Sequence, residues 1–154
     1  MNVKQIKWHA AVLAVTIFAA LTVLFAMATV TSNAADAVYD ETTRTYTMSD
    51  STYDQQIVLE DGTTTTIDIS GYNMLTYGTS YYYSECISGT GNLKIIGSGT
   101  LVVPNGMISC TDLTIGDGVK LIIDRSIYIN GNITMGNAEI EPGSQNAYMY
   151  CYNS

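Results

Sequence analysis

A repeat of twenty residues constrains the fold of this chain more than any other feature of its sequence. Leu93, Leu113 and Ile133 are apolar residues that follow one another at this spacing. Further apolar columns share the step: Leu75, Ile95, Ile115 and Met135; Ile67, Ile87, Met107 and Ile127; Leu101 and Leu121; Val103 and Ile123. Several independent columns at one period predict a stack of similar units, each of which contacts its neighbours.

The composition around these columns favours strands. After residue 37 the chain is rich in Thr, Val, Ile, Tyr and Gly, and apolar residues alternate with polar ones in short runs. We expect three strands per coil, near residues 93–96, 100–103 and 107–109, each stacked about 4.8 Å from its counterpart one coil away. The predicted fold class is all-β: a short right-handed parallel β-helix, or β-solenoid, of about 20 residues per coil, preceded by a hydrophobic signal helix.

The register divides the chain into four segments. Residues 1–37 are predicted to be a signal peptide or an N-terminal membrane anchor. Residues 38–55 fit the register poorly and are predicted to form an N-terminal arm or cap strand. Residues 56–144 hold the predicted parallel solenoid of about four coils. Residues 145–154 are predicted to form a C-terminal tail strand.

The N-terminus has the order of features found in an export signal. A short basic segment precedes the uncharged residues 10–30, and Ala35 and Ala37 bracket Asp36 in the small-x-small pattern of a signal-peptidase site. We predict cleavage after Ala37, with cleavage after Ala34 as the alternative. The apolar stretch is also long enough to span a bilayer, so an uncleaved anchor is the other interpretation. Either way the rest of the chain is expected outside the cell or at its surface, with a membrane partner only if the leader is retained.

The net charge of the exported part limits the classes of partner that it can bind. Residues 1–37 hold two lysines, one aspartate and the single histidine, so their removal leaves 4 basic and 13 acidic residues and a net charge of −9. A surface this negative repels phosphate backbones, so no nucleic-acid partner is expected. Without histidine, the exported part offers carboxylates and carbonyls to a cation, which suits calcium. Calcium is therefore the one cofactor that we consider.

Short polar residues at a corner of the predicted coil are the candidate metal ligands. Asn92, Asp112 and Asn132 share one column. They could surround a cation, or they could form a ladder of side chains that bond to one another and to turn backbone, which is the interpretation that we favour. Asp117 and Asp124 complete the metal candidates with Asp112, although the preceding coil has no carboxylate at the positions equivalent to these two.

Tyrosine is the candidate side chain for binding a ligand. Tyr81, Tyr82 and Tyr83 form a cluster, and Tyr128 follows two coils later. Aromatic faces stack on sugar rings, and the tyrosine hydroxyl bonds to sugar hydroxyls. The other interpretation is that tyrosine is frequent here because it favours strands.

The three cysteines test the register, because disulfides are permitted in an exported protein. In the twenty-residue register Cys110 lies over Thr90, four residues from Cys86, which is about 13 Å along the strand. That distance exceeds the reach of a disulfide, so we expect no bond between these two cysteines. Cys151 lies in the tail, and its pairing is left open.

Four stretches of the sequence resemble a known family. Residues 45–49 (TYTMS), 56–59 (QIVL), 91–103 (GNLKIIGSGTLVV) and 112–115 (DLTI) are similar to the secreted bacterial right-handed parallel β-helix carbohydrate-binding domains. The resemblance implies a fold like that of pectate lyases, an acidic polysaccharide ligand and bound calcium. The chain departs from the family in its short length and in lacking acid-rich turns.

Two functions are consistent with these observations. The first is a non-catalytic carbohydrate-binding protein whose ligand is a polysaccharide or cell-wall glycan, since a solenoid offers a long rigid face to a polymer. The second is an extracellular structural or adhesive protein that self-associates through the ends of the solenoid. A polysaccharide lyase is disfavoured, because the candidate catalytic residues fall in different columns; they are Lys94, Lys120, Asp124 and Arg125.

Overall fold

The computed structural model describes residues 36–77 and 84–152, which belong to the compact unit Ala34–Ser154. These residues form strands and no helix, which confirms the all-β fold class. Nothing in these two ranges is a helix that could span a membrane. The predicted signal helix, the Tyr81–Tyr83 cluster and the last two residues of the tail lie outside the described residues.

The strands follow one another in short segments. They are β1 (Val38–Asp40), β2 (Thr45–Ser49), β3 (Thr52–Tyr53), β4 (Ile57–Leu59), β5 (Thr64–Leu75), β6 (Glu85–Gly89), β7 (Asn92–Val103), β8 (Met107–Cys110), β9 (Leu113–Ile115), β10 (Val119–Ile123), β11 (Ser126–Ile129), β12 (Ile133–Met135), β13 (Glu139–Pro142) and β14 (Tyr148–Cys151).

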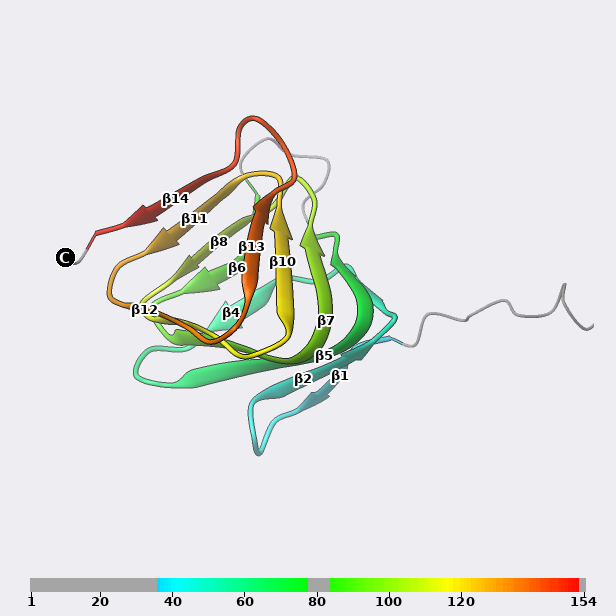
Figure 1. Ribbon diagram of the computed structural model, residues 1–154. Coiled ribbons are helices and arrows are strands. Elements are labelled where there is room, and N and C mark those ends of the chain that lie inside the picture. Colours follow the sequence, from blue (N-terminus) through cyan, green and yellow to red (C-terminus); the bar gives the residue numbers. More distant parts are fainter. Residues whose placement is uncertain (1–35, 78–83, 153–154) are drawn as a thin grey trace, which may run out of the picture. The chain divides into compact units, whose positions relative to one another are not determined.

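The chain passes back and forth between two sheets (Figure 1). The larger sheet has the order β1-β2-β5-β7-β10-β13, with β3 paired to β5, β9 to β7 and β12 to β9. The smaller sheet has the order β14-β11-β8-β6-β4. All of these pairs are parallel except β1 with β2. Each passage through both sheets, which we call a coil, therefore returns the chain one strand further along each sheet.

The twenty-residue register is confirmed where β7 pairs with β9 and β10 and where β9 pairs with β12. Leu93 pairs with Leu113, which pairs with Ile133, and Leu101 pairs with Leu121. The strands expected at 93–96 and 100–103 are one continuous strand, β7, and the strand expected at 107–109 is β8. Gly97 sits where β7 bends, with a φ of 96°, and a Cβ there would lie 2.1 Å from the carbonyl oxygen of Ile69.

The same register is wrong before β7. Ile67 pairs with Ile95, 28 residues later, so neither the step from Leu75 to Ile95 nor the step from Ile67 to Ile87 exists. The reason is a long connection: residues 76–84 join β5 to β6, whereas residues 104–106 alone join β7 to β8. Loop length on the outside of a stack is weakly constrained, so the apolar columns continue across it at a different spacing.

A smaller correction concerns the second sheet. Ile87 pairs with Ile108 and not with Met107, because the register shifts between Glu85 and Ile87. Ile108 in turn pairs with Ile127, and Ile57 pairs with Ile87. The inward column of this sheet is therefore formed by isoleucines at uneven spacing.

The stack begins earlier than the predicted boundary at residue 56. Strands β2 and β3 pair in parallel with β5, and β1 pairs antiparallel with β2. Tyr46 and Met48 alternate with exposed residues and point into the core. Residues 38–55 thus contain one antiparallel edge strand and the first strands of the stack. At the other end, β14 pairs with β11 and continues the smaller sheet.

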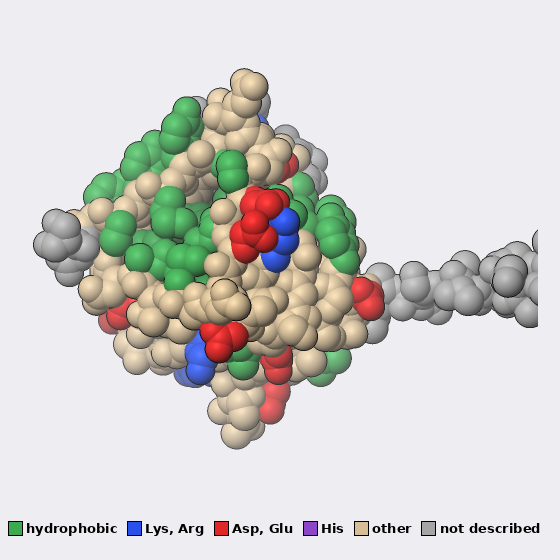
Figure 2. Space-filling view, in the orientation of Figure 1, with side chains coloured by type: hydrophobic (Ala, Val, Ile, Leu, Met, Phe, Trp, Pro, Cys, Tyr) green, Lys and Arg blue, Asp and Glu red, His purple; other side chains and the backbone are tan. Residues whose placement is uncertain are grey.

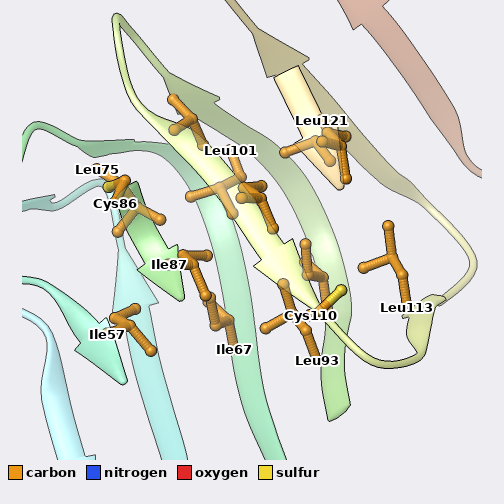
Figure 3. Close-up of a cluster of buried hydrophobic side chains, with 14 of the residues drawn as sticks. Ile57, Ile67, Leu75, Cys86, Ile87, Leu93, Leu101, Cys110, Leu113 and Leu121 are labelled. Atoms are coloured by element: carbon orange, nitrogen blue, oxygen red, sulfur yellow. The ribbon is translucent and has the colours of Figure 1, made fainter. Parts of the chain in front are cut away.

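The core lies between the two sheets and consists of their inward side chains (Figure 3). In β9 and β10 every second residue is buried, as expected for strands with one face on a core. Leu113 stacks between Leu93 and Ile133, so like side chains fill the interior from coil to coil. A side chain inside the stack is covered by the coils on both sides of it.

We predict that a buried column residue is worth far more in the middle of the stack than in the last coil. Ile115 is fully buried, and Ile115→Ala should lower the free energy of unfolding by about 2–5 kcal/mol. Met135 belongs to the same column but is 43% exposed, so Met135→Ala should cost about 1 kcal/mol or less. Urea denaturation of the two variants checks this, and equal costs would contradict the stacked arrangement.

Candidate ligand-binding surface

Tyrosines line the outer face of the smaller sheet where it ends. In β14, Met149 stacks on Ile127 and Cys151 on Ile129, both of which are buried. Side chains alternate along a strand, so Tyr148 and Tyr150 between them point to the outer face. Their exposed fractions are 56% and 41%, and Tyr152, just past the strand, is 63% exposed.

The rings of these residues lie next to one another, two pairs stacked and one pair tilted. Tyr128 pairs with Tyr150 in the register of β11 and β14, and their rings stack with centroids 5.0 Å apart and planes within 6°. The rings of Tyr150 and Tyr152 are 6.4 Å apart and within 12° of parallel. Tyr148 lies 6.3 Å from Tyr150 with its ring tilted by 38°. We call these four residues the tyrosine row.

The sequence pointed to part of this surface. Tyr128 was a predicted ligand-binding residue, and it lies in the tyrosine row beside three tyrosines that sequence reasoning did not place. The signal that could have found them is their alternation at 148, 150 and 152, which puts all three on one face of a strand. The predicted cluster Tyr81–Tyr83 lies outside the described residues.

The strands β11 and β14 that carry the tyrosine row hold no charged residue, and the basic residue beside them is Arg125, whose backbone carbonyl accepts a hydrogen bond from the Tyr148 N–H. Between residues 126 and 152 the charged side chains are Glu139 and Glu141, and both form ion pairs with Lys120, at 3.5 and 2.8 Å. The Lys120 ammonium lowers the pKa of the Glu141 carboxyl, and Glu141 raises the pKa of Lys120. These charges belong to the larger sheet, so the row itself presents rings and hydroxyls.

The polar corner column forms hydrogen bonds from coil to coil. Asn92 Oδ1 accepts a hydrogen bond from the backbone N–H of Asp112 at 3.2 Å. Asp112 Oδ1 accepts one from the backbone N–H of Asn132 at 2.7 Å, and the Asn132 side-chain amide donates to the same oxygen at 3.4 Å. Each side chain thus satisfies a backbone donor of the next coil, as short polar residues do at turns.

The three predicted metal ligands do not meet. Asp117 Oδ1 accepts a hydrogen bond from the backbone N–H of Asn137 at 2.6 Å, which repeats the role of Asp112 at another corner. The backbone carbonyl of Asp124 accepts from the Ser144 hydroxyl. In the part of the chain that the structure describes, no three His, Cys, Asp or Glu side chains gather closely enough to hold a metal ion.

The residues considered for lyase chemistry are also dispersed. Lys94 lies opposite Thr114, in the pairing of β7 with β9. Lys120 lies opposite Thr100, in the pairing of β7 with β10, and is engaged by Glu139 and Glu141. Lys94 therefore lies on the first part of β7, whereas Lys120 lies on β10 beside the last part of β7, so the two lysines do not face one reacting centre.

Cys86 and Cys110 are fully buried in the core. Ile87 pairs with Ile108, so Cys110 falls opposite Gly89, one residue from the predicted Thr90 and about 10 Å from Cys86. Figure 3 shows the two on different sides of the core, Cys86 beside Leu75. Burial raises the pKa of each thiol to about 12. Cys151 is exposed, and Ile129 lies between it and Cys110 in the column.

Comparisons of the chain with family models, with curated proteins and with solved structures give no match. Functional inference for this chain therefore depends on its own residues and their geometry.

The role of Asp112 can be separated from metal binding by two substitutions. Asp112→Ala removes the acceptor for the Asn132 N–H and should cost about 1 kcal/mol of stability, with or without calcium. Asp112→Asn keeps an oxygen at that position and should retain at least half of the contribution. The measurement is urea denaturation in calcium and in chelator. A stability that rises with calcium in the native protein and not in Asp112→Asn would contradict the hydrogen-bonding role.

Thiol reactivity should divide the cysteines into two classes. With a pKa near 12, about one thiol in ten thousand is ionised at pH 8, and the thiolate is the reactive form. Cys86 and Cys110 should therefore resist a thiol reagent until the protein unfolds, since raising the pH within the native range leaves them protonated. Mass spectrometry of alkylated native and urea-treated protein checks this, and modification of either residue in the native state would contradict it.

Proposed function

We propose that this chain is a secreted or cell-surface, non-catalytic carbohydrate-binding protein with the fold of a short right-handed parallel β-solenoid. The observation that carries the function is the tyrosine row on an exposed, nearly uncharged face. The resemblance to secreted β-helix carbohydrate-binding domains supports the same conclusion from the sequence.

The pairing of the strands supports the solenoid. Both sheets are parallel apart from β1, and the chain alternates between them while moving one strand along at each coil. Right-handed connections are expected, because parallel strands joined by a crossover are right-handed in nearly all proteins.

The position of the first strand supports export with cleavage after Ala37. Strand β1 begins at Val38, so cleavage there would release the stack with its first strand intact. An uncleaved leader would present the same stack at a membrane surface.

The tyrosine row supports a sugar ligand. Aromatic rings bury the apolar faces of sugar rings, and tyrosine adds a hydroxyl that bonds to sugar hydroxyls. The near-parallel rings of Tyr150 and Tyr152 offer contacts in series along the strand, which suits a polymer more than a single sugar. Strands β11 and β14 carry no basic side chain to attract an acidic polysaccharide, and the Nε atom of the neighbouring Arg125 is buried. We therefore propose a neutral glycan, which departs from the acidic ligand that the family resemblance implies.

Neither catalysis nor calcium is needed for this function. The lysines considered for lyase chemistry lie apart, and Lys120 is held by two glutamates. The side-chain oxygens of Asp112 and Asp117 bind backbone N–H groups of the following coil.

The proposal is tested by sedimentation with insoluble neutral polysaccharides. Tyr148→Ser and Tyr152→Ser should each weaken binding about tenfold, because each removes one exposed ring from the row. Val58→Ser is the matched control, because Val58 is 61% exposed on the same sheet at its other end. Binding that survives both tyrosine substitutions, or that Val58→Ser abolishes, would contradict the assignment.

A further inference from the structure

The last coil exposes side chains that the preceding coils bury. Met149 stacks on Ile127 and Met135 on Ile115, and these isoleucines are at most 1% exposed. The two methionines are each 43% exposed, because no further coil covers them. The apolar side chains of this coil are Ile133, Met135, Ala138, Ile140, Ala147 and Met149, and we call them the end surface. Figure 2 shows hydrophobic side chains gathered on the face that carries β12, β13 and β14.

The backbone at the end surface is also ready to pair. Strand β13 is an edge strand of the larger sheet, and β14 is an edge strand of the smaller sheet. Each pairs along one edge, and within residues 36–77 and 84–152 no strand pairs with the other edge. An edge strand presents N–H and C=O groups that can form hydrogen bonds with a strand of another chain. The end surface thus combines an apolar centre with hydrogen-bonding edges.

The opposite end of the stack buries its inward side chains, although β4 has an unpaired edge in the smaller sheet among the described residues. Tyr39 and Tyr53 pack against Tyr46 with ring centroids 4.3 and 5.5 Å away. Met48 and Ile57, which belong to the first coil, are at most 1% exposed. The first strand, β1, runs antiparallel to the stack and covers the edge of β2. At this end the inward side chains are therefore covered, whereas those of the last coil are not.

The two ends also differ in charge. Residues 38–68 carry seven carboxylates and a single basic residue, Arg44. Residues 126–152 carry two carboxylates, Glu139 and Glu141, and both pair with Lys120. Two copies of the acidic end would repel each other strongly, whereas the last coil with Lys120 has one carboxylate in excess, so two copies of the end surface repel each other far less. Of the two ends, the charge pattern favours self-association through the last coil.

We propose that the end surface docks onto the same surface of a second copy of this chain. A two-fold axis normal to the smaller sheet would pair β14 with β14 of the second copy in antiparallel orientation. The exposed methionines would then be covered by the second copy, as a further coil would cover them. Because a two-fold contact uses the end surface of both copies, the assembly stops at two copies and does not grow into a fibre.

This geometry has a consequence for the tyrosine row. A two-fold axis normal to the sheet leaves the outer faces of both copies on the same side, so the two rows adjoin on one continuous sheet. If the glycan-binding proposal is correct, the dimer holds two rows in fixed relation and gains avidity for a polymer. Self-association itself does not depend on glycan binding.

Light scattering of the exported protein in reducing buffer, across a dilution series, tests the proposal. The expected result is twice the mass of one chain, falling to the single mass on dilution. Met149→Lys places a charge on the end surface and should give a single chain at all concentrations, with at least a tenfold weaker association. Val58→Lys is the control: it alters an apolar residue that is 61% exposed, against 43% for Met149, at the opposite end of the smaller sheet, and it should leave the dimer intact.

Each alternative outcome overturns the proposal. A single chain for the unaltered protein would show that the end surface has another occupant or none. Mass that grows without limit, or that Val58→Lys reduces, would show head-to-tail assembly. A dimer that survives Met149→Lys, or that is lost in Cys151→Ser, would show a different contact. Circular dichroism of each variant separates loss of association from loss of folding, and Tyr152→Ser should change glycan binding while leaving the mass unchanged.

Discussion

The fold depends on the stacking of one coil upon the next. No single coil has an interior of its own: its inward side chains are covered when the next coil repeats them at the same place, as Leu113 is by Leu93 and Ile133. Backbone pairing fixes the same register. At the corners, side-chain oxygens also accept hydrogen bonds from backbone N–H groups of the next coil; these side chains are Asn92, Asp112 and Asp117. Apolar columns, parallel ladders and corner hydrogen bonds are therefore three results of one constraint.

The same constraint explains where the candidate surfaces lie. Inside the stack, inward positions are restricted to side chains that pack, while outward positions are free to vary. The tyrosine row uses outward positions of β11 and β14, so it can carry four rings without disturbing the core. The end surface arises where stacking stops, because inward residues such as Met149 lack the coil that covers Ile127. Both surfaces are thus consequences of position in the stack.

Sequence reasoning recovered the part of the fold in which the repeat is regular. From Leu93 onward the spacing identified the correct partners in the larger sheet, because short connections transmit the period of the stack, but it misplaced Met107 in the smaller sheet. Before β7 it failed at Ile67 and Leu75, since residues 76–84 lengthen one coil without altering its core. The alternation at 148, 150 and 152 puts these tyrosines on one face of a strand. That this face is the outer one, beside Tyr128, follows from the pairing of β14 with β11, which the uneven spacing of this sheet concealed. The exposure of Met135 could not be read from its column, because it depends on where stacking ends.

The measurement that tests the stacking register most directly is a disulfide cross-link between adjacent coils. Lys94 and Thr114 are paired on the outer face of β7 and β9, so Lys94→Cys with Thr114→Cys, in a Cys151→Ser background, should form a disulfide on oxidation. Lys94→Cys with Thr134→Cys is the mismatched pair, because Thr134 lies one coil beyond Thr114 and about 10 Å from Lys94. Rapid cross-linking of the first pair and none of the second is the predicted result. No cross-link in the first pair, or equal cross-linking in both, would contradict the coil-to-coil register.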